Sequence, residues 1–220
     1  MLINNIDNET MYKIVILGPP GSGKGTQAKL LSQELNIPAI STGKIFRTAM
    51  KNDTELGKQV RERMDAGNLI DDDLTNKIVK ERLVEPDVAN GYILDGYPRT
   101  SGQVVFLDKL ADISFVLNID SNDDVITKRM AARRMCKECG ANFNILFKPS
   151  KVEGVCDKCN GELYMRSDAK PEAIKERIST YHGLINPILD FYSKKGILIN
   201  INGEPSIEDV WREVKDKLSL

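Results

Sequence analysis

Residues 14–26, IVILGPPGSGKGT, join a short apolar segment to a glycine-rich turn that ends in Lys24, Gly25 and Thr26. Backbone N–H groups at such a turn, where a helix begins, form a binding site for anions, and the helix dipole strengthens it. The lysine adds a mobile charge for terminal phosphates, and the threonine offers a hydroxyl to magnesium. Gly25 stands where the general pattern G-x-x-x-x-G-K-[ST] has its hydroxyl, and Thr26 follows one residue later. We therefore expect a phosphate-binding loop of a particular subtype.

The four cysteines form two pairs, Cys136-x-x-Cys139 and Cys156-x-x-Cys159. Two such turns can place four thiolates around one ion, and the spacing is typical of a zinc ribbon. Disulfides or free thiols are the alternatives, and disulfides are disfavoured in a reducing compartment. Four protein ligands leave no open position for water, so the zinc would be structural. It would replace the core that a segment of about 30 residues is too small to build.

Single charged residues carry weaker signals. Asp95 ends an apolar segment at the carboxyl edge of the expected sheet, where ligands bind in open α/β folds. A carboxylate there can hold magnesium through water molecules, and a turn or helix cap is the alternative. Arg129 and Arg133 are four residues apart, so we expect them to share a helix face. His182 lies in a helical stretch and is expected to pack or to face solvent.

Five apolar segments are expected to be strands, at about 12–17, 39–41, 91–95, 113–119 and 196–202, and a helical stretch follows each. This alternation predicts an α/β fold with a five-stranded parallel sheet and helices on both faces. We expect Pro38 to end the first helix, Gly67 to end a later one, and Ser206 to cap the last. Two insertions interrupt the plan, a helical one at 41–84 and one rich in cysteine, glycine and lysine at 136–165. The remaining core consists of residues 12–40, 85–135 and 166–220, and it is preceded by an N-terminal extension, residues 1–11.

The composition limits the classes of protein. The 220 residues hold 31 basic and 32 acidic side chains, a net charge of −1, which argues against a general nucleic-acid binder. No apolar run approaches the roughly 18 residues that a membrane span requires, and no signal peptide is apparent. We therefore expect a cytoplasmic protein with neither a membrane nor a nucleic acid as its partner.

The segment YILDGYPRTSGQ, residues 92–103, together with GPPGSGKGTQ (18–27) and STGKIFR (41–47), resembles the adenylate kinase family. The resemblance covers nearly the whole chain. It implies a P-loop kinase that binds ATP, AMP and ADP and catalyses ATP + AMP ⇌ 2 ADP with Mg²⁺. It makes residues 41–84 an AMP-binding insertion and residues 136–165 a zinc-binding lid over ATP, as in one subset of the family. Monomer and homo-oligomer both stay open, because the extension could dock on its own subunit or on another.

The resemblance also implies roles for individual residues. Catalysis would use Lys24, Arg99, Arg129, Arg133, Arg166 and Arg177. Arginine suits this role because it is always charged and can bind a phosphate group in a bidentate manner. ATP would be bound by Gly21, Ser22, Gly23, Lys24, Gly25, Thr26, Arg129, Arg133, Asn142, Phe143 and Pro205. AMP would be bound by Thr42, Arg47, Leu69, Ile70, Gly96, Arg99, Gln103, Arg166 and Arg177, with the amide of Gln103 reading adenine. Structural Zn²⁺ would be held by Cys136, Cys139, Cys156 and Cys159, and Mg²⁺, through waters, by Asp95 and Thr26.

The chain departs from the family pattern at two charged positions. Lys44 stands where STGD has its aspartate, and Ala169 replaces the last aspartate of R-x-D-D. We expect these changes to affect metal dependence, AMP affinity and lid closure, but not the type of reaction. Two alternatives remain at this point. One is a kinase of another nucleoside monophosphate. The other is a zinc-ribbon P-loop ATPase that acts as a nucleotide switch for nucleic acid or protein, which would leave the DGYPR segment and Gln103 unexplained.

Overall fold

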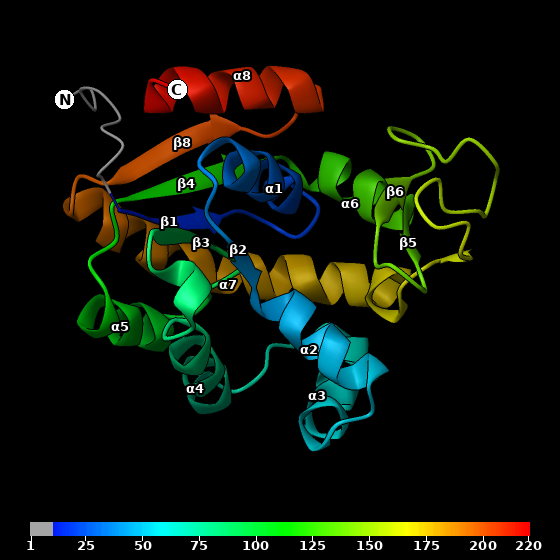
Figure 1. Ribbon diagram of the computed structural model, residues 1–220, viewed down its shortest axis with the longest axis horizontal. Helices are drawn as coiled ribbons and strands as arrows, with labels where there is room; N and C mark the ends of the chain where they lie inside the picture. The colour runs from blue at the N-terminus through cyan, green and yellow to red at the C-terminus, as the bar shows by residue number, and fades with distance from the viewer. Residues whose placement is uncertain (1–10) are drawn as a thin grey trace.

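The structure is a computed structural model that describes residues 11–220, so all but one residue of the expected N-terminal extension lies outside it. Its centre is a parallel sheet in the order β2-β3-β1-β4-β8 (Figure 1). The strands are β1 (Tyr12–Leu17), β2 (Ala39–Ser41), β3 (Gly91–Asp95), β4 (Phe115–Asp120) and β8 (Leu198–Asn202). The predicted five-stranded parallel sheet is therefore confirmed.

Both faces of the sheet are covered, and this explains why most residues of the central strands β1, β3 and β4 are apolar and buried. Ile14 and Ile16 of β1 pack toward α1 and α8, whereas Val15 and Leu17 pack toward α5 and α7. The flanking helices are α1 (Lys24–Glu34), α5 (Ser101–Leu110), α6 (Asp123–Ala131), α7 (Pro171–Lys194) and α8 (Ile207–Leu218). Figure 1 shows α8 and the long α7 on opposite sides of the sheet.

The helix boundaries follow local chemistry. Gly67 ends α3 with φ 86°, and Ser206 accepts the Asp209 N–H at 3.1 Å at the start of α8, as predicted. The prediction for Pro38 is wrong. Helix α1 ends at Glu34, and Asn36 turns the chain with φ 51° before the proline is reached. An asparagine tolerates this left-handed conformation, so the chain leaves the helix without help from the proline.

The first insertion, residues 41–84, is helical and has a small core of its own. It holds α2 (Thr42–Lys51), α3 (Glu55–Ala66) and α4 (Asp72–Arg82), followed by the short η1 (Pro86–Val88). Phe46, Val60 and Ile70 form its buried centre. This core lets the insertion keep its shape beside the main sheet.

The second insertion, residues 136–165, is called the lid below and is built around a three-stranded antiparallel sheet in the order β6-β5-β7. Its strands are β5 (Arg133–Cys136), β6 (Asn142–Asn144) and β7 (Leu163–Tyr164), and η2 (Ser167–Ala169) leads back to α7. Its buried centre consists of Cys136, Phe143 and Cys156, with Ala141 and Leu163 packed against it. Within residues 11–220, no helix is both long and apolar enough to cross a membrane.

Candidate active site

The phosphate loop joins β1 to α1 at the carboxyl edge of the sheet. Gly18 adopts φ +139°, and a Cβ there would lie 2.1 Å from the carbonyl oxygen of Ile119, so only glycine fits. A Cβ on Gly25 would lie 3.3 Å from Oδ2 of Asp95. A longer side chain at this position would meet that carboxylate. Gly25 therefore lets the start of α1 lie close to the Asp95 carboxylate.

Lys24 is surrounded by charge. Its Nζ donates to the carbonyl oxygen of Pro19 at 2.9 Å. Burial lowers the pKa of the ammonium group to about 7, with nearby Arg99 and Arg177 acting in the same direction and Asp95 opposing them. A phosphate group beside Lys24 would reverse this shift, because a neighbouring anion favours the charged form.

Asp95 fits a magnesium ion. Its Oδ1 is buried and has no hydrogen-bond partner among the described residues. A buried carboxylate oxygen left in this state requires a partner, and oxygen ligands are what Mg²⁺ prefers. Thr26 lies exposed in the first turn of α1, one residue beyond Gly25. Asp95 and Thr26 could therefore hold a hydrated ion.

All nine residues expected around AMP line one open cleft, which contains about 550 Å³ of empty space. They come from distant parts of the chain: Thr42, Arg47, Leu69, Ile70, Gly96, Arg99, Gln103, Arg166 and Arg177. Inside this cleft, the Thr42 hydroxyl donates to the Gly96 carbonyl at 3.2 Å. The structure thus assembles the whole set that the resemblance selects.

Gln103 lines this cleft, is 2% exposed, and makes one hydrogen bond at each end of its side-chain amide. Its Oε1 accepts the backbone N–H of Arg99 at 2.7 Å, and its Nε2 donates to Oδ1 of Asp72 at 2.8 Å. Asp72 is a residue that the sequence did not single out. In the sequence, Asp72 is only the middle one of three consecutive aspartates, residues 71–73, a pattern that is typical of a helix start.

Buried Asp168 also lines this cleft and binds two arginines. It accepts hydrogen bonds from Arg166 and, at 2.6 Å, from Nη1 of Arg177. Burial and neighbouring guanidinium groups lower the pKa of Arg47 to about 9, and burial lowers that of Arg177 to about 10. These arginines are therefore still protonated at neutral pH, and the cleft concentrates positive charge.

Asp168 was also missed as a site residue, because the sequence showed it only as part of a family pattern. Arg133 belongs to the same cluster, since burial and the charge of Arg166 lower its pKa. Lys44, by contrast, is exposed and lines neither this cleft nor the hollow beside the phosphate loop. Its charge therefore lies outside the cleft.

Arg129 and Arg133 do not share a helix face, so that prediction is wrong. Helix α6 ends at Ala131, and Arg133 opens strand β5. The guanidinium of Arg129 turns away and donates to the carbonyls of Ser22 and residues 203–205, at 2.6 to 3.3 Å. It also lies 5.8 Å from the ring centroid of Phe147. Arg129 thus links the phosphate loop to the segment that contains Pro205.

The two lid residues expected near ATP differ in their surroundings. Asn142 is exposed, whereas Phe143 is buried in the centre of the lid with Cys136 and Cys156. The Phe143 side chain therefore stabilises the lid. Only the backbone N–H and carbonyl groups of Phe143 would be available to contact a nucleotide.

The helical insertion contacts both the lid and the segment that follows the lid. The Lys51 ammonium donates to the lid carbonyls of Lys137 at 2.8 Å and Glu138 at 3.2 Å. The hydroxyl of Ser167 in η2 donates to Oδ1 of Asp65 at 2.6 Å. These contacts tie the insertion to the lid and to η2.

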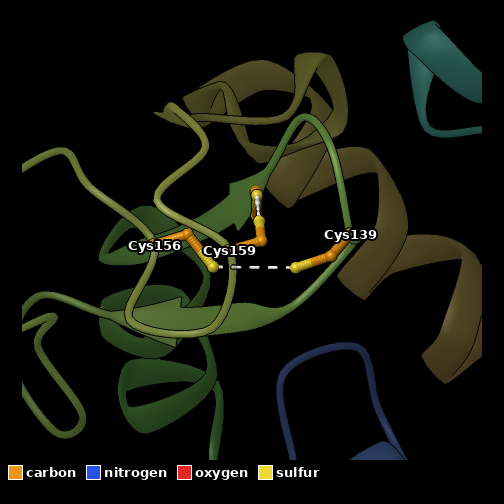
Figure 2. Close-up of side chains that lie close together, drawn as sticks. Cys139, Cys156 and Cys159 are labelled. Atoms are coloured by element: carbon orange, nitrogen blue, oxygen red, sulfur yellow. Dashed lines mark hydrogen bonds between the residues drawn. The ribbon is translucent and has the colours of Figure 1, made fainter.

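The four cysteines meet as predicted. Their sulfur atoms all lie within 4.8 Å of one another, and Figure 2 shows three of the side chains converging. The sulfurs of Cys136 and Cys159 are 3.5 Å apart, and those of Cys139 and Cys156 are 3.6 Å apart. Such distances are too long for a disulfide, whose bond is about 2.05 Å. They are close to the edge of about 3.8 Å expected for a tetrahedron with Zn–S bonds of about 2.3 Å.

Backbone groups prepare this site for a cation. The N–H of Cys139 heads a set of donors that lowers the pKa of the Cys136 thiol to about 7. At Cys159 the lowering effect of the Gly161 N–H is outweighed by hydrogen bonds with the other three thiols, so the pKa of this thiol is raised. Thiolates are the form that ligates zinc, so a lowered pKa favours binding. The residues therefore fit a structural zinc ion with four sulfur ligands.

A family model described as adenylate kinase matches residues 16–197. The chain belongs to the adenylate kinase family. It is 49% identical to an adenylate kinase of Methanothrix thermoacetophila, with 94% of this chain and 98% of the relative covered. It is 46% identical to adenylate kinases of Caldicellulosiruptor bescii and Listeria monocytogenes, with 94% of this chain and 99% of each relative covered.

These matches confirm the resemblance found in the motifs and the P-loop kinase fold. The chain is accordingly a nucleoside monophosphate kinase, a phosphotransferase. The interpretation as a zinc-ribbon ATPase switch has no support from the comparisons. Both the phosphate loop and the cysteine cluster are accounted for within an adenylate kinase.

Proposed function

We propose that this adenylate kinase catalyses ATP + AMP ⇌ 2 ADP with magnesium. The observation that carries the proposal is the continuity of its cleft. The hollow that contains Gln103 and the hollow that contains Lys24 share five lining residues, namely Gly67, Leu69, Gly96, Arg99 and Arg177. A monophosphate whose base lies at Gln103 would therefore direct its phosphate toward the phosphate loop.

The residues of this cleft suit in-line phosphoryl transfer, which needs positioning and neutralisation of charge rather than a covalent nucleophile. In the proposal, Arg47 and Arg99 hold the phosphate of AMP. Lys24, Arg133 and Arg177 neutralise the group in transfer. The acceptor phosphate is already anionic, so no general base is needed.

The remaining charged residues have supporting roles. Asp168 orients Arg166 and Arg177 by its hydrogen bonds. His182 is exposed and pairs with Asp123 at 2.8 Å, away from this chemistry. Arg129 fixes the segment 203–205 by donating to its three carbonyls. Each of these carbonyls keeps a second lone pair that could accept from the base of ATP.

Two metal ions complete the proposal. Asp95 and Thr26 would hold Mg²⁺ through water molecules. When bound, Mg²⁺ would offset the negative charge of the phosphate groups. Zinc at the four cysteines would be structural, and four thiol ligands favour a reducing compartment such as the cytoplasm.

The choice of acceptor can be tested directly. Purified protein is given MgATP and AMP, GMP, CMP or UMP in turn, and kcat/KM is measured for each monophosphate. We expect AMP to be preferred, because the Gln103 amide offers an acceptor and a donor that match the edge of adenine. Preference for another monophosphate would contradict the proposal and favour a kinase of that nucleotide.

A further inference from the structure

The side-chain amide of Gln103 lies between two groups of opposite character. A backbone N–H, from Arg99, can only donate, and it meets Oε1 at 2.7 Å. A carboxylate, from Asp72, can only accept, and it meets Nε2 at 2.8 Å. The two ends of the amide are therefore distinguished from each other by their neighbours.

This arrangement selects one of the two orientations of the amide. A flipped Gln103 would place its NH₂ group against the Arg99 N–H and its oxygen against the Asp72 carboxylate. Both hydrogen bonds would then be replaced by contacts between like groups. In the observed orientation, one N–H and one oxygen lone pair remain free of these two partners, and Gln103 lines the cleft where they can be used.

The carboxylate of Asp72 is itself held in place. Its second oxygen, Oδ2, accepts the hydroxyl of Thr100 at 2.6 Å. That hydroxyl in turn accepts the backbone N–H of Gln103 at 3.1 Å and so caps α5. Asp72 thus joins the start of α4 in the AMP-binding insertion to the start of α5 in the core. The orientation of the amide depends on both segments.

We propose that Asp72 is a positioning residue that sets the base preference of the monophosphate site by fixing the orientation of the Gln103 amide. The inference rests on the proposed function. A 6-aminopurine presents a donor beside a ring acceptor, which matches the available oxygen and N–H of Gln103. A 6-oxopurine presents the reverse pattern and would be read well only after the flip that Asp72 opposes.

The test is the substitution Asp72→Asn, because an asparagine amide can present either an oxygen or an NH₂ group to Gln103. Asp73→Asn is the matched control. It removes an exposed carboxylate from the same first turn of α4 and so costs the same charge near the helix N-terminus. For wild type and both variants, kcat and KM are measured with AMP and with GMP at fixed MgATP. Thermal melting reports stability.

We expect Asp72→Asn to lower the AMP-to-GMP ratio of kcat/KM by about tenfold, since a hydrogen bond to a charged group is lost. The change should lie mainly in KM for AMP, and Asp73→Asn should keep the wild-type ratio. Asp72→Glu, which retains a carboxylate, should restore most of the preference. An unchanged ratio in Asp72→Asn, whatever its melting temperature, would overturn the inference and leave Asp72 a merely structural role.

Two measurements distinguish a failure of this inference from a failure of the proposed function and from a variant that does not fold. A wild-type protein that does not use AMP would refute the proposed function before any variant is compared. If Asp72→Asn does not fold, NMR of the unaltered protein decides. The Gln103 side-chain amide protons should show an NOE to the β-protons of Asp72. A strong NOE to the Arg99 amide proton instead would show the flipped orientation and overturn the inference.

Discussion

Lys24 should take up a proton when ATP binds. Burial lowers the pKa of its ammonium group to about 7 in the free protein, against a usual value of 10.5. Phosphate oxygens beside the ammonium would raise this pKa again, because an adjacent opposite charge favours the protonated form. Between pH 7 and the pKa of the complex, binding therefore captures protons, and the affinity for ATP falls as pH rises.

The size of the effect follows from the two pKa values. At pH 8 a group of pKa 7 is about one-tenth protonated, whereas a group near 10.5 is almost fully protonated. Binding at pH 8 should therefore take up about 0.9 proton per ATP, and about 0.5 proton at pH 7. Between pH 7 and pH 8 the Kd for ATP should rise about fivefold, and above pH 8 the rise should approach about tenfold per pH unit.

Isothermal titration calorimetry measures this uptake when the same titration is run in two buffers of different ionisation enthalpy. Lys24→Arg is the matched control, because a guanidinium is always charged and should bind ATP with almost no proton uptake. Uptake below about 0.2 proton at pH 8 in the wild type would refute the reasoning. Equal uptake in Lys24→Arg would show that another group titrates.

Three further predictions concern the metal, the acceptor and the bases. Metal analysis should find one zinc per chain. A chelator or Cys139→Ser should lower the melting temperature and make the lid sensitive to protease under conditions in which the central sheet is still resistant. Unchanged stability without metal would exclude a structural role for zinc. Arg99→Ala should raise KM for AMP much more than KM for ATP in steady-state kinetics, and an equal loss for both substrates would argue against its place on the acceptor side. The triphosphate base should be selected less strictly than the monophosphate base, because residues 203–205 offer backbone carbonyls and Gln103 offers a fixed amide. The spread of kcat/KM across ATP, GTP and CTP, compared with the spread across AMP, GMP and CMP, measures this, and a wider spread among the triphosphates would contradict it.

The elements that could be predicted from the sequence are those whose cause is local. The strands come from short apolar segments, and the phosphate loop comes from glycines that the turn itself requires, as at Gly18. The cysteine cluster was predictable because two C-x-x-C turns already bring their own sulfurs together. The cleft residues were predictable only through long motifs that resemble the family.

The features that were missed depend on contacts between distant segments. Asp72 reads as an ordinary helix-start acid, and its role becomes visible only when it meets Gln103 of another helix. Asp168 likewise matters through the arginines that fold around it. Arg129 was placed beside Arg133 because the pattern alone could not show that α6 ends between them. Periodicity predicts a face only as long as the helix continues.

The measurement that tests the central claim most directly is the stoichiometry of the reaction. MgATP and AMP are mixed with the purified protein, and ATP, AMP, ADP and inorganic phosphate are followed together by anion-exchange chromatography. The account predicts that two ADP form for each ATP and AMP consumed, that no phosphate is released, and that ADP alone regenerates both substrates. Release of phosphate from ATP at a rate that does not depend on AMP would contradict it.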